Sequence, residues 1–150
     1  MKFYGLAYRN LDAKGRLLLP PEFRDNILSN IEEKSVVLSI YNNQIIGISP
    51  SQWEHIVQEL DKIKAPSNEM EETKILLFSN YVLAPVSKQG RIAIPAHLRQ
   101  NGNIGTEMEV VVFGAGNRFE IRPKEEYTGM LNKKRDVSGE LRENNSDLGL

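Results

Sequence analysis

The chain has 150 residues, 40% of them hydrophobic, which suits one ordinary globular domain or two small units. It has no cysteine, which excludes disulfides, thiol nucleophiles and cysteine-based zinc sites. The formal net charge of −1 conceals an uneven distribution, because residues 1–24 and 80–100 each carry +3 and residues 50–75 carry −3. Apolar runs are too short to span a bilayer and the start lacks a signal-peptide core, so the sequence predicts a cytoplasmic protein without membrane contact.

One short passage occurs twice in the chain. Residues 12–16 read D-A-K-G-R and residues 87–91 read S-K-Q-G-R, and each passage is followed by three apolar residues and a proline. At an offset of 75 the match pairs Gly15 with Gly90, Arg16 with Arg91, Arg24 with Arg99, and Val36-Val37 with Val111-Val112. A slip of two residues then aligns Ile48 with Ile121. Such self-similarity predicts a tandem duplication of a unit of roughly 50 residues.

The first unit, residues 1–64, is expected to begin with a strand over residues 3–12. A tight turn at Lys14-Gly15 leads to a second strand that ends at proline, which cannot donate to a strand ladder. A short helix is expected from Pro21, and a hairpin of residues 36–41 and 44–48 follows it. Ser49-Pro50-Ser51-Gln52 is typical of a helix start, and the apolar spacing after it predicts a helix that contains Trp53.

Residues 65–79 are expected to hold a linker helix, from about residue 68. The second unit, residues 80–132, repeats the pattern of the first with a strand over 81–86, a turn at Gln89-Gly90, a short helix from Pro95, a hairpin of 109–113 with 118–122, and a last helix from Pro123. The segment 133–150 is polar and has no aromatic residue, which predicts a disordered tail.

The repeated turn carries the strongest functional signal. Strand alternation assigns Leu17 and Leu19 to the core and turns Arg16 outward; the second copy turns Arg91 outward in the same way. Gly15 and Gly90 permit the positive φ of a tight turn. An outward arginine with Lys14 or Lys88 beside it favours recognition of phosphate or guanine. Arg24 and Arg99 add secondary basic charge, and the outward Leu18 predicts a second contact such as a neighbouring subunit.

Asp12 needs a separate explanation, because a carboxylate repels phosphate. It is expected to hold the Arg16 guanidinium in one rotamer through a charge-assisted hydrogen bond. The competing interpretation is that both arginines are solvated turn residues and that the Asp12–Arg16 pair contributes about 0–1 kcal/mol. The recurrence of the arginine in both copies favours the functional interpretation.

These two passages and the opening M-x-F-x-G resemble the MraZ family, whose halves are each similar to the SpoVT/AbrB swapped-hairpin domain. The resemblance covers roughly residues 1–132. It implies an α+β, mainly β, fold of two tandem swapped-hairpin half-barrels with flanking helices. It also implies a bacterial transcriptional regulator, nucleoid-associated, that binds repeated double-stranded DNA sites upstream of the division and cell-wall gene cluster as a ring-shaped homo-oligomer.

Carried over by position, the family motif maps to Asp12 and Arg16 in the first half and to Arg91 in the second. Ser87 departs from the pattern, because the family expects an aspartate there as well. A serine can still accept a hydrogen bond from Arg91 but lacks the charge. The second turn is therefore expected to be more basic and less rigidly oriented than the first.

Other functions have less support in the sequence. The two histidines, His55 and His97, lack metal-ligand spacing, and Gly114–Gly116 joins two strands without the helix that a phosphate-binding loop needs. We expect no enzyme activity, metal, cofactor or small-molecule substrate. The alternative that stays open is a protein-interaction or antitoxin-like module of the same fold without specific DNA readout, although the tail offers few apolar anchors for a partner.

Overall fold

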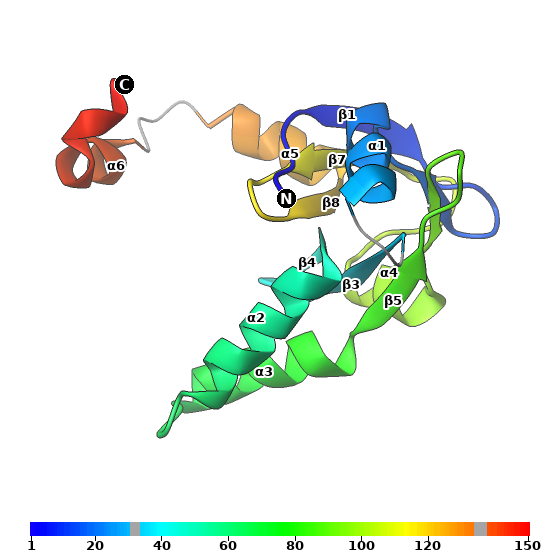
Figure 1. Cartoon of the computed structure of the whole chain (residues 1–150). Helices are drawn as coiled ribbons and strands as arrows, with labels where there is room; N and C mark the ends of the chain where they lie inside the picture. The colour runs from blue at the N-terminus through cyan, green and yellow to red at the C-terminus, as the bar shows by residue number, and fades with distance from the viewer. Residues whose placement is uncertain (31–33, 134–137) are drawn as a thin grey trace.

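Two antiparallel sheets join the two sequence units in the computed structural model, which describes residues 1–30, 34–133 and 138–150 (Figure 1). The larger sheet has six strands in the order β1-β7-β8-β4-β3-β5, and the smaller one pairs β2 with β6. The strands are β1 Leu6–Asn10, β2 Arg16–Leu18, β3 Ser35–Tyr41, β4 Gln44–Ile48, β5 Val82–Pro85, β6 Arg91–Ala93, β7 Glu109–Gly114 and β8 Phe119–Pro123.

The strand pairing exchanges partners between the units. β1 of the first unit pairs with β7 of the second, β5 of the second pairs with β3 of the first, and β4 pairs with β8. The entering strand of each unit therefore leaves its own hairpin and completes the sheet of the other. This arrangement confirms the α+β fold of two swapped-hairpin half-barrels, and both units contribute to one six-stranded sheet.

Helices α1 to α5 agree with the predicted elements and begin at or next to the caps and prolines of the sequence, whereas α6 was not predicted. They are α1 Pro21–Asn30, α2 Pro50–Asp61, α3 Asn68–Ser79, α4 Ala96–Asn101, α5 Lys124–Leu131 and α6 Gly139–Asn144. The Ser49 hydroxyl accepts from the Gln52 N–H at 3.1 Å, and the Ser67 hydroxyl accepts from the Met70 N–H at 3.2 Å. These side chains satisfy donors that a helix start leaves unpaired. Helices α2 and α3 form an arm that leaves the sheet (Figure 1).

The tail differs from the predicted disorder. Residues 138–150 form the short helix α6 and a 3₁₀ turn over Ser146–Leu148, while residues 134–137 lie outside the described residues. Glu140 in the first turn and Arg142 in the last turn suit the helix dipole, which favours this local structure despite the polar composition. No described residue of α6 is buried, so the helix adds nothing to the core.

The core lies between the two units. Phe3 and Phe23 from the first unit meet Phe119 from the second, with ring centroids 5.2–5.6 Å apart, and all three side chains are buried. Gly47 in β4 leaves room for this cluster, because a Cβ at that position would overlap the Phe119 ring. The halves therefore share a core that neither could complete alone.

The structure corrects the alignment of the two hairpins. Val37 pairs with Leu83 and Ile48, and Val111 pairs with Tyr8 and Arg122. Val37 thus corresponds to Val111, and Ile48 corresponds to Arg122, at an offset of 74; the sequence alignment used 75 for the first pair and matched Ile48 to Ile121. A slip of one residue reverses the face of a strand, and only the offset of 74 keeps Val36 and Val110 in the same core.

The outer faces of the two halves differ. On the first unit, α2 and the linker helix α3 cover Val37, Ile46 and Ile48 with a second apolar cluster that includes Trp53 and Leu77. In the second unit, the position of Ile46 is occupied by Glu120, which is 4% exposed and pairs with Arg118 and Arg122 at 2.8 Å each. In the described part of the second unit, α5 is the helix that packs on this face, through the stacked rings of Tyr127 and Phe113.

Candidate nucleic-acid interface

The two repeated turns lie side by side at the end of the molecule away from the helical arm (Figure 1). The β2–β6 register places Arg16 opposite Ala93, Leu17 opposite Ile92 and Leu18 opposite Arg91. Leu17 and Ile92 are buried beneath this ribbon, and the other four residues form its exposed face. Arg16 and Arg91 are therefore diagonal neighbours on one surface, with Cα atoms about 7–8 Å apart by ordinary ladder geometry.

Asp12 organises the first turn. Its Oδ1 accepts from the backbone N–H groups of Lys14 at 2.9 Å and Arg16 at 2.8 Å, and its Oδ2 accepts from Arg16 Nε at 2.7 Å. The predicted contact between the carboxylate and the guanidinium is confirmed. The hydrogen bond from the Arg16 backbone N–H is the main cause that lowers the pKa of Asp12, and the Arg16 side chain and the Lys14 N–H add to it against the opposing effect of desolvation.

The second turn has the same backbone but a different side-chain contact. Gly90 N donates to Ser87 O at 2.8 Å, as Gly15 N donates to Asp12 O at 3.0 Å. The Ser87 hydroxyl accepts from the backbone N–H of Arg91 at 2.9 Å. Across the described ranges, no hydrogen bond or ion pair joins the Arg91 guanidinium to another residue. Lys88 beside it is exposed, as Lys14 is in the first turn.

Each turn is held by the other half of the chain. Ile94 N donates to Gly15 O at 3.0 Å, and Leu19 N donates to Gly90 O at 2.9 Å. Gly15 has φ of +77° and Gly90 has φ of +90°, so both lie in the region that favours glycine. The turns are therefore joined by backbone hydrogen bonds as well as by the ribbon.

The secondary basic residues lie against these glycines. Arg99 of α4 donates from Nη1 to Ile94 O, and a Cβ at Gly15 would overlap its guanidinium. Arg24 of α1 lies over Gly90, where an added Cβ would come within 3.0 Å of its side chain, and its Nε pairs with Asp25 at 2.9 Å. These contacts give both arginines a bracing role, and their contact with DNA stays a prediction.

Sequence reasoning missed the role of Arg9. This residue of β1 donates from Nε to Leu18 O at 3.1 Å and so ties the first unit's entering strand to the ribbon. The sequence signal is an arginine in a strand that is predicted to be largely apolar. Its charge contributes to the basic segment 1–24, but the sequence does not show which group it contacts. At the offset of 75 its counterpart is Ala84, a buried residue of β5, so the second turn lacks this contact.

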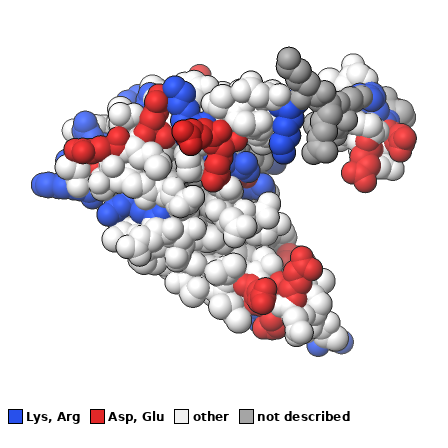
Figure 2. Space-filling model, turned by 180° about the vertical axis from the view of Figure 1, so that it is seen from behind, with Lys and Arg blue, Asp and Glu red and all other residues white. Residues whose placement is uncertain are grey.

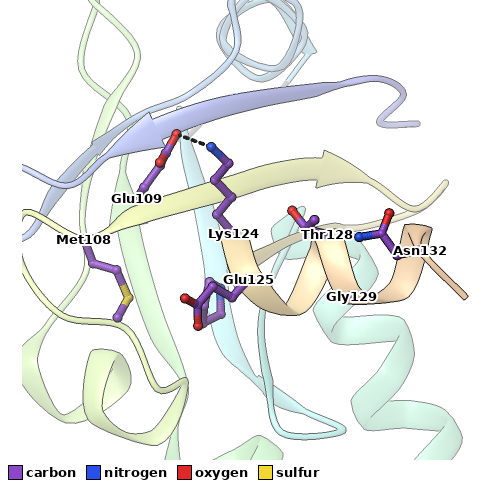
Figure 3. A pocket seen from close by; sticks show the side chains of 8 residues that line it. Met108, Glu109, Lys124, Glu125, Thr128, Gly129 and Asn132 are labelled. Atoms are coloured by element: carbon purple, nitrogen blue, oxygen red, sulfur yellow. Dashed lines mark hydrogen bonds and ion pairs between the residues drawn. The ribbon is translucent and has the colours of Figure 1, made fainter.

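One surface hollow lies away from the turns, on the side of α5. It is an open groove of about 690 Å³ between the start of β7 and α5, lined by Met108, Glu109, Pro123, Lys124, Glu125, Thr128, Gly129 and Asn132 (Figure 3). Lys124 points to Glu109 and pairs with it at 3.2 Å. In the described parts of the chain, no three metal-ligating side chains gather, and no helix is long and apolar enough to cross a bilayer.

Comparison with known proteins agrees with the doubled architecture. A family model described as "MraZ protein, putative antitoxin-like" matches the chain twice, over residues 3–78 and 77–146. The chain belongs to the MraZ family. The transcriptional regulator MraZ of Maridesulfovibrio salexigens is 41% identical over 144 residues, which are 95% of each chain. Its namesakes in Oleidesulfovibrio alaskensis and Pediococcus pentosaceus are 36% and 31% identical over 99% of each chain. The MraZ family is one of transcriptional regulators and not of enzymes.

Replacing Gly15 by alanine should lower the free energy of unfolding by more than the cost of placing alanine at a positive φ. Gly116 also has a positive φ, of +87°, but open space around it, so Gly116→Ala should cost about 1–2 kcal/mol. Gly15→Ala adds overlap with Arg99 and should cost about 1–3 kcal/mol more. Urea unfolding measures both values, and adding Arg99→Ala should remove the part of the excess that comes from the guanidinium, while the contact of the added Cβ with Ile94 O at 3.2 Å remains. Equal losses at the two glycines would contradict this packing.

The Asp12 carboxyl should titrate below the ordinary aspartate pKa of about 3.9. Because the pKa of Asp12 is lower in the folded than in the unfolded chain, the ionised carboxylate stabilises the fold at pH values above the unfolded-state pKa. This contribution is lost as the pH falls through the folded-state pKa. In Arg16→Ala the pKa should rise but stay below the ordinary value, since the backbone N–H of residue 16 remains. Carboxyl chemical shifts report both titrations; an ordinary pKa in wild type would exclude the turn hydrogen bonds in solution.

Proposed function

We propose that the chain is a transcriptional regulator that binds double-stranded DNA through the exposed face of the β2–β6 ribbon. The observation that supports this most directly is the pair of arginines, Arg16 and Arg91, on one solvent-facing surface with a lysine in each adjoining turn. A ribbon of two strands fits the major groove, which is about 12 Å wide. Promoter repeats upstream of the division and cell-wall gene cluster are the proposed target, on the basis of the family resemblance.

The charge distribution supports this orientation. In Figure 2, lysine and arginine side chains project from the end of the molecule that carries the turns, with acidic side chains next to some of them, whereas most charged side chains near the end of the helical arm are acidic. Phosphates would therefore attract the turn end and repel the arm. The acid nearest the ribbon, Asp12, is engaged by three hydrogen bonds within its own turn, which limits its repulsion of DNA.

We also propose that copies assemble head to tail into a ring. The end of helix α3 carries the apolar run Ile75–Phe78: Leu77 packs inward, while Ile75 is 59% exposed and Leu76 is 44% exposed. Exposed apolar surface of this kind favours contact with another protein surface. Leu83, on the adjoining edge strand β5, is also exposed, and Figure 2 shows an uncharged face over the arm.

The opposite edge of the sheet offers a second, different apolar surface. Tyr4 precedes β1, and Leu6 and Tyr8 project from this edge strand; the three side chains are 68%, 45% and 45% exposed. Contact between two different surfaces gives a heterologous interface, which closes into a ring when the rotation per subunit allows it. Such a ring would hold several ribbons at fixed spacing and raise their effective concentration on repeated DNA sites.

Arg16→Ala should weaken binding to promoter DNA by about 10-fold or more, since a guanidinium contact to a base is worth about 1–3 kcal/mol. Fluorescence anisotropy with a duplex from immediately upstream of the chain's own gene measures this loss. Lys62→Ala, which removes a positive charge from the arm, is the control and should change affinity by less than about twofold. Absence of DNA binding by folded wild type would favour the protein-interaction alternative.

Leu83→Arg should reduce the assembled mass, because it places a charge in the proposed apolar contact. The control is Leu131→Arg on α5, where the leucine is 61% exposed and lies outside both proposed surfaces. Native mass spectrometry and light scattering give the subunit number of each variant. A wild type that is monomeric would overturn the ring, and an unchanged mass in Leu83→Arg would place the interface elsewhere.

A further inference from the structure

We propose that the two turns divide the work of recognition: Arg16 reads the edge of a guanine, and Arg91 binds a backbone phosphate. The inference rests on the proposed DNA-binding function and concerns the roles within that site. It arises from two of the differences between the two copies, Asp12 against Ser87 in the turns and Arg9 against Ala84 in the strands that enter them. Each difference makes the first turn more rigid than the second.

The Arg16 side chain is fixed in a way that leaves its far end free. Asp12 Oδ2 holds Nε at 2.7 Å, and Asp12 Oδ1 holds the Arg16 backbone N–H at 2.8 Å. The side chain is still 48% exposed, and no hydrogen bond to the two terminal Nη groups is present within the described ranges. Two parallel donors in a fixed plane match the O6 and N7 acceptors of guanine. Holding them in advance reduces the entropy lost on binding.

Arg9 strengthens this arrangement from strand β1. Its Nε donates to Leu18 O at 3.1 Å, two residues beyond Arg16 on the same short strand. The counterpart Ala84 has no side chain that could reach β6. The first arginine therefore stands on a strand that is held by both β6 and the Arg9 side chain. A base edge offers its acceptors in only one orientation, so this rigidity suits base readout.

Arg91 has the properties of a phosphate ligand. The Ser87 hydroxyl accepts from the Arg91 backbone N–H at 2.9 Å and does not reach the guanidinium, which no acceptor in the described ranges orients. The second turn contains two cations, Lys88 and Arg91, and no acid, whereas the first contains two cations and Asp12. A phosphate can be approached from many directions and responds mainly to charge, so a mobile side chain in the more basic turn suits it.

Arginine-to-lysine exchanges separate the two roles, because lysine keeps the charge and loses the planar fork. Anisotropy over a series of salt concentrations would compare wild type, Arg16→Lys and Arg91→Lys on the upstream duplex and on scrambled DNA of equal length. Arg16→Lys should lower the affinity ratio between the two DNAs by about 10-fold or more, and Arg91→Lys should change it by less than about twofold. Arg91→Ala should reduce the salt slope by about 1 on both DNAs.

A second variant tests the same inference without touching either arginine. Asp12→Ser makes the first turn resemble the second, where serine already supports the same backbone, so the fold should be retained. Asp12→Ser should lower the ratio of the affinities for the upstream duplex and for scrambled DNA. The affinity for scrambled DNA should stay within about twofold of the wild-type value or increase, because a negative charge is removed. Far-UV circular dichroism checks the fold of every variant.

The outcomes distinguish this inference from the function on which it rests. A wild type that binds neither DNA overturns both. A wild type that prefers the upstream duplex, with equal losses of the affinity ratio in Arg16→Lys and Arg91→Lys, retains the DNA-binding function and overturns the division of roles. An affinity ratio in Asp12→Ser that equals the wild-type ratio would also overturn it.

Discussion

Two backbone hydrogen bonds exchanged between the turns determine the geometry of the whole basic end. Ile94 N donates to Gly15 O, and Leu19 N donates to Gly90 O, so each turn is completed by a strand from the other half. The buried ribbon residues Leu17 and Ile92 lie directly beneath this junction. Each turn also has backbone hydrogen bonds of its own, from Gly15 N to Asp12 O and from Gly90 N to Ser87 O, so the exchanged pair fixes how the two turns lie against each other. The arginines are thus presented by the junction between the repeats rather than by either repeat.

The outer faces show how far the halves have diverged around this junction. The first half covers its outer strands with α2 and α3, whereas the second replaces an apolar position with Glu120 held between Arg118 and Arg122. A buried carboxylate is tolerated only when such partners compensate its desolvation. In the described chain, the projecting helical arm with its exposed Ile75 and Leu76 belongs to the side of the first half. A chain with this polarity suits contact between unlike surfaces better than contact between two copies of the same surface.

Local features of the site could be predicted from the sequence, and long-range ones could not. In each copy, the glycine turn and the outward arginine lie within five consecutive residues, as does the Asp12–Arg16 contact of the first copy. Strand alternation and turn geometry are enough to predict features of this range. The partner of β1 is β7, about a hundred residues away, and nothing in the local pattern identifies it; the swapped pairing followed from the family resemblance alone. Packing of Arg99 on Gly15 and the offset of 74 between the hairpins depend on that pairing. The polar composition of the tail predicts no structure, and it does not register that Glu140 and Arg142 lie at the ends of a helix where their charges are favourable.

The ribbon also bears on how the protein responds to its own abundance. β2 and β6 belong to one polypeptide, so the linker between the halves keeps them together at any dilution. In a regulator whose ribbon formed between two separate chains, a falling copy number would dissolve the DNA-contacting surface itself. Here the covalent connection makes the ribbon intrinsic to the folded monomer, and in the proposed ring only the number of joined ribbons would vary with concentration. Cellular dosage would then tune avidity without altering the shape presented to the double helix.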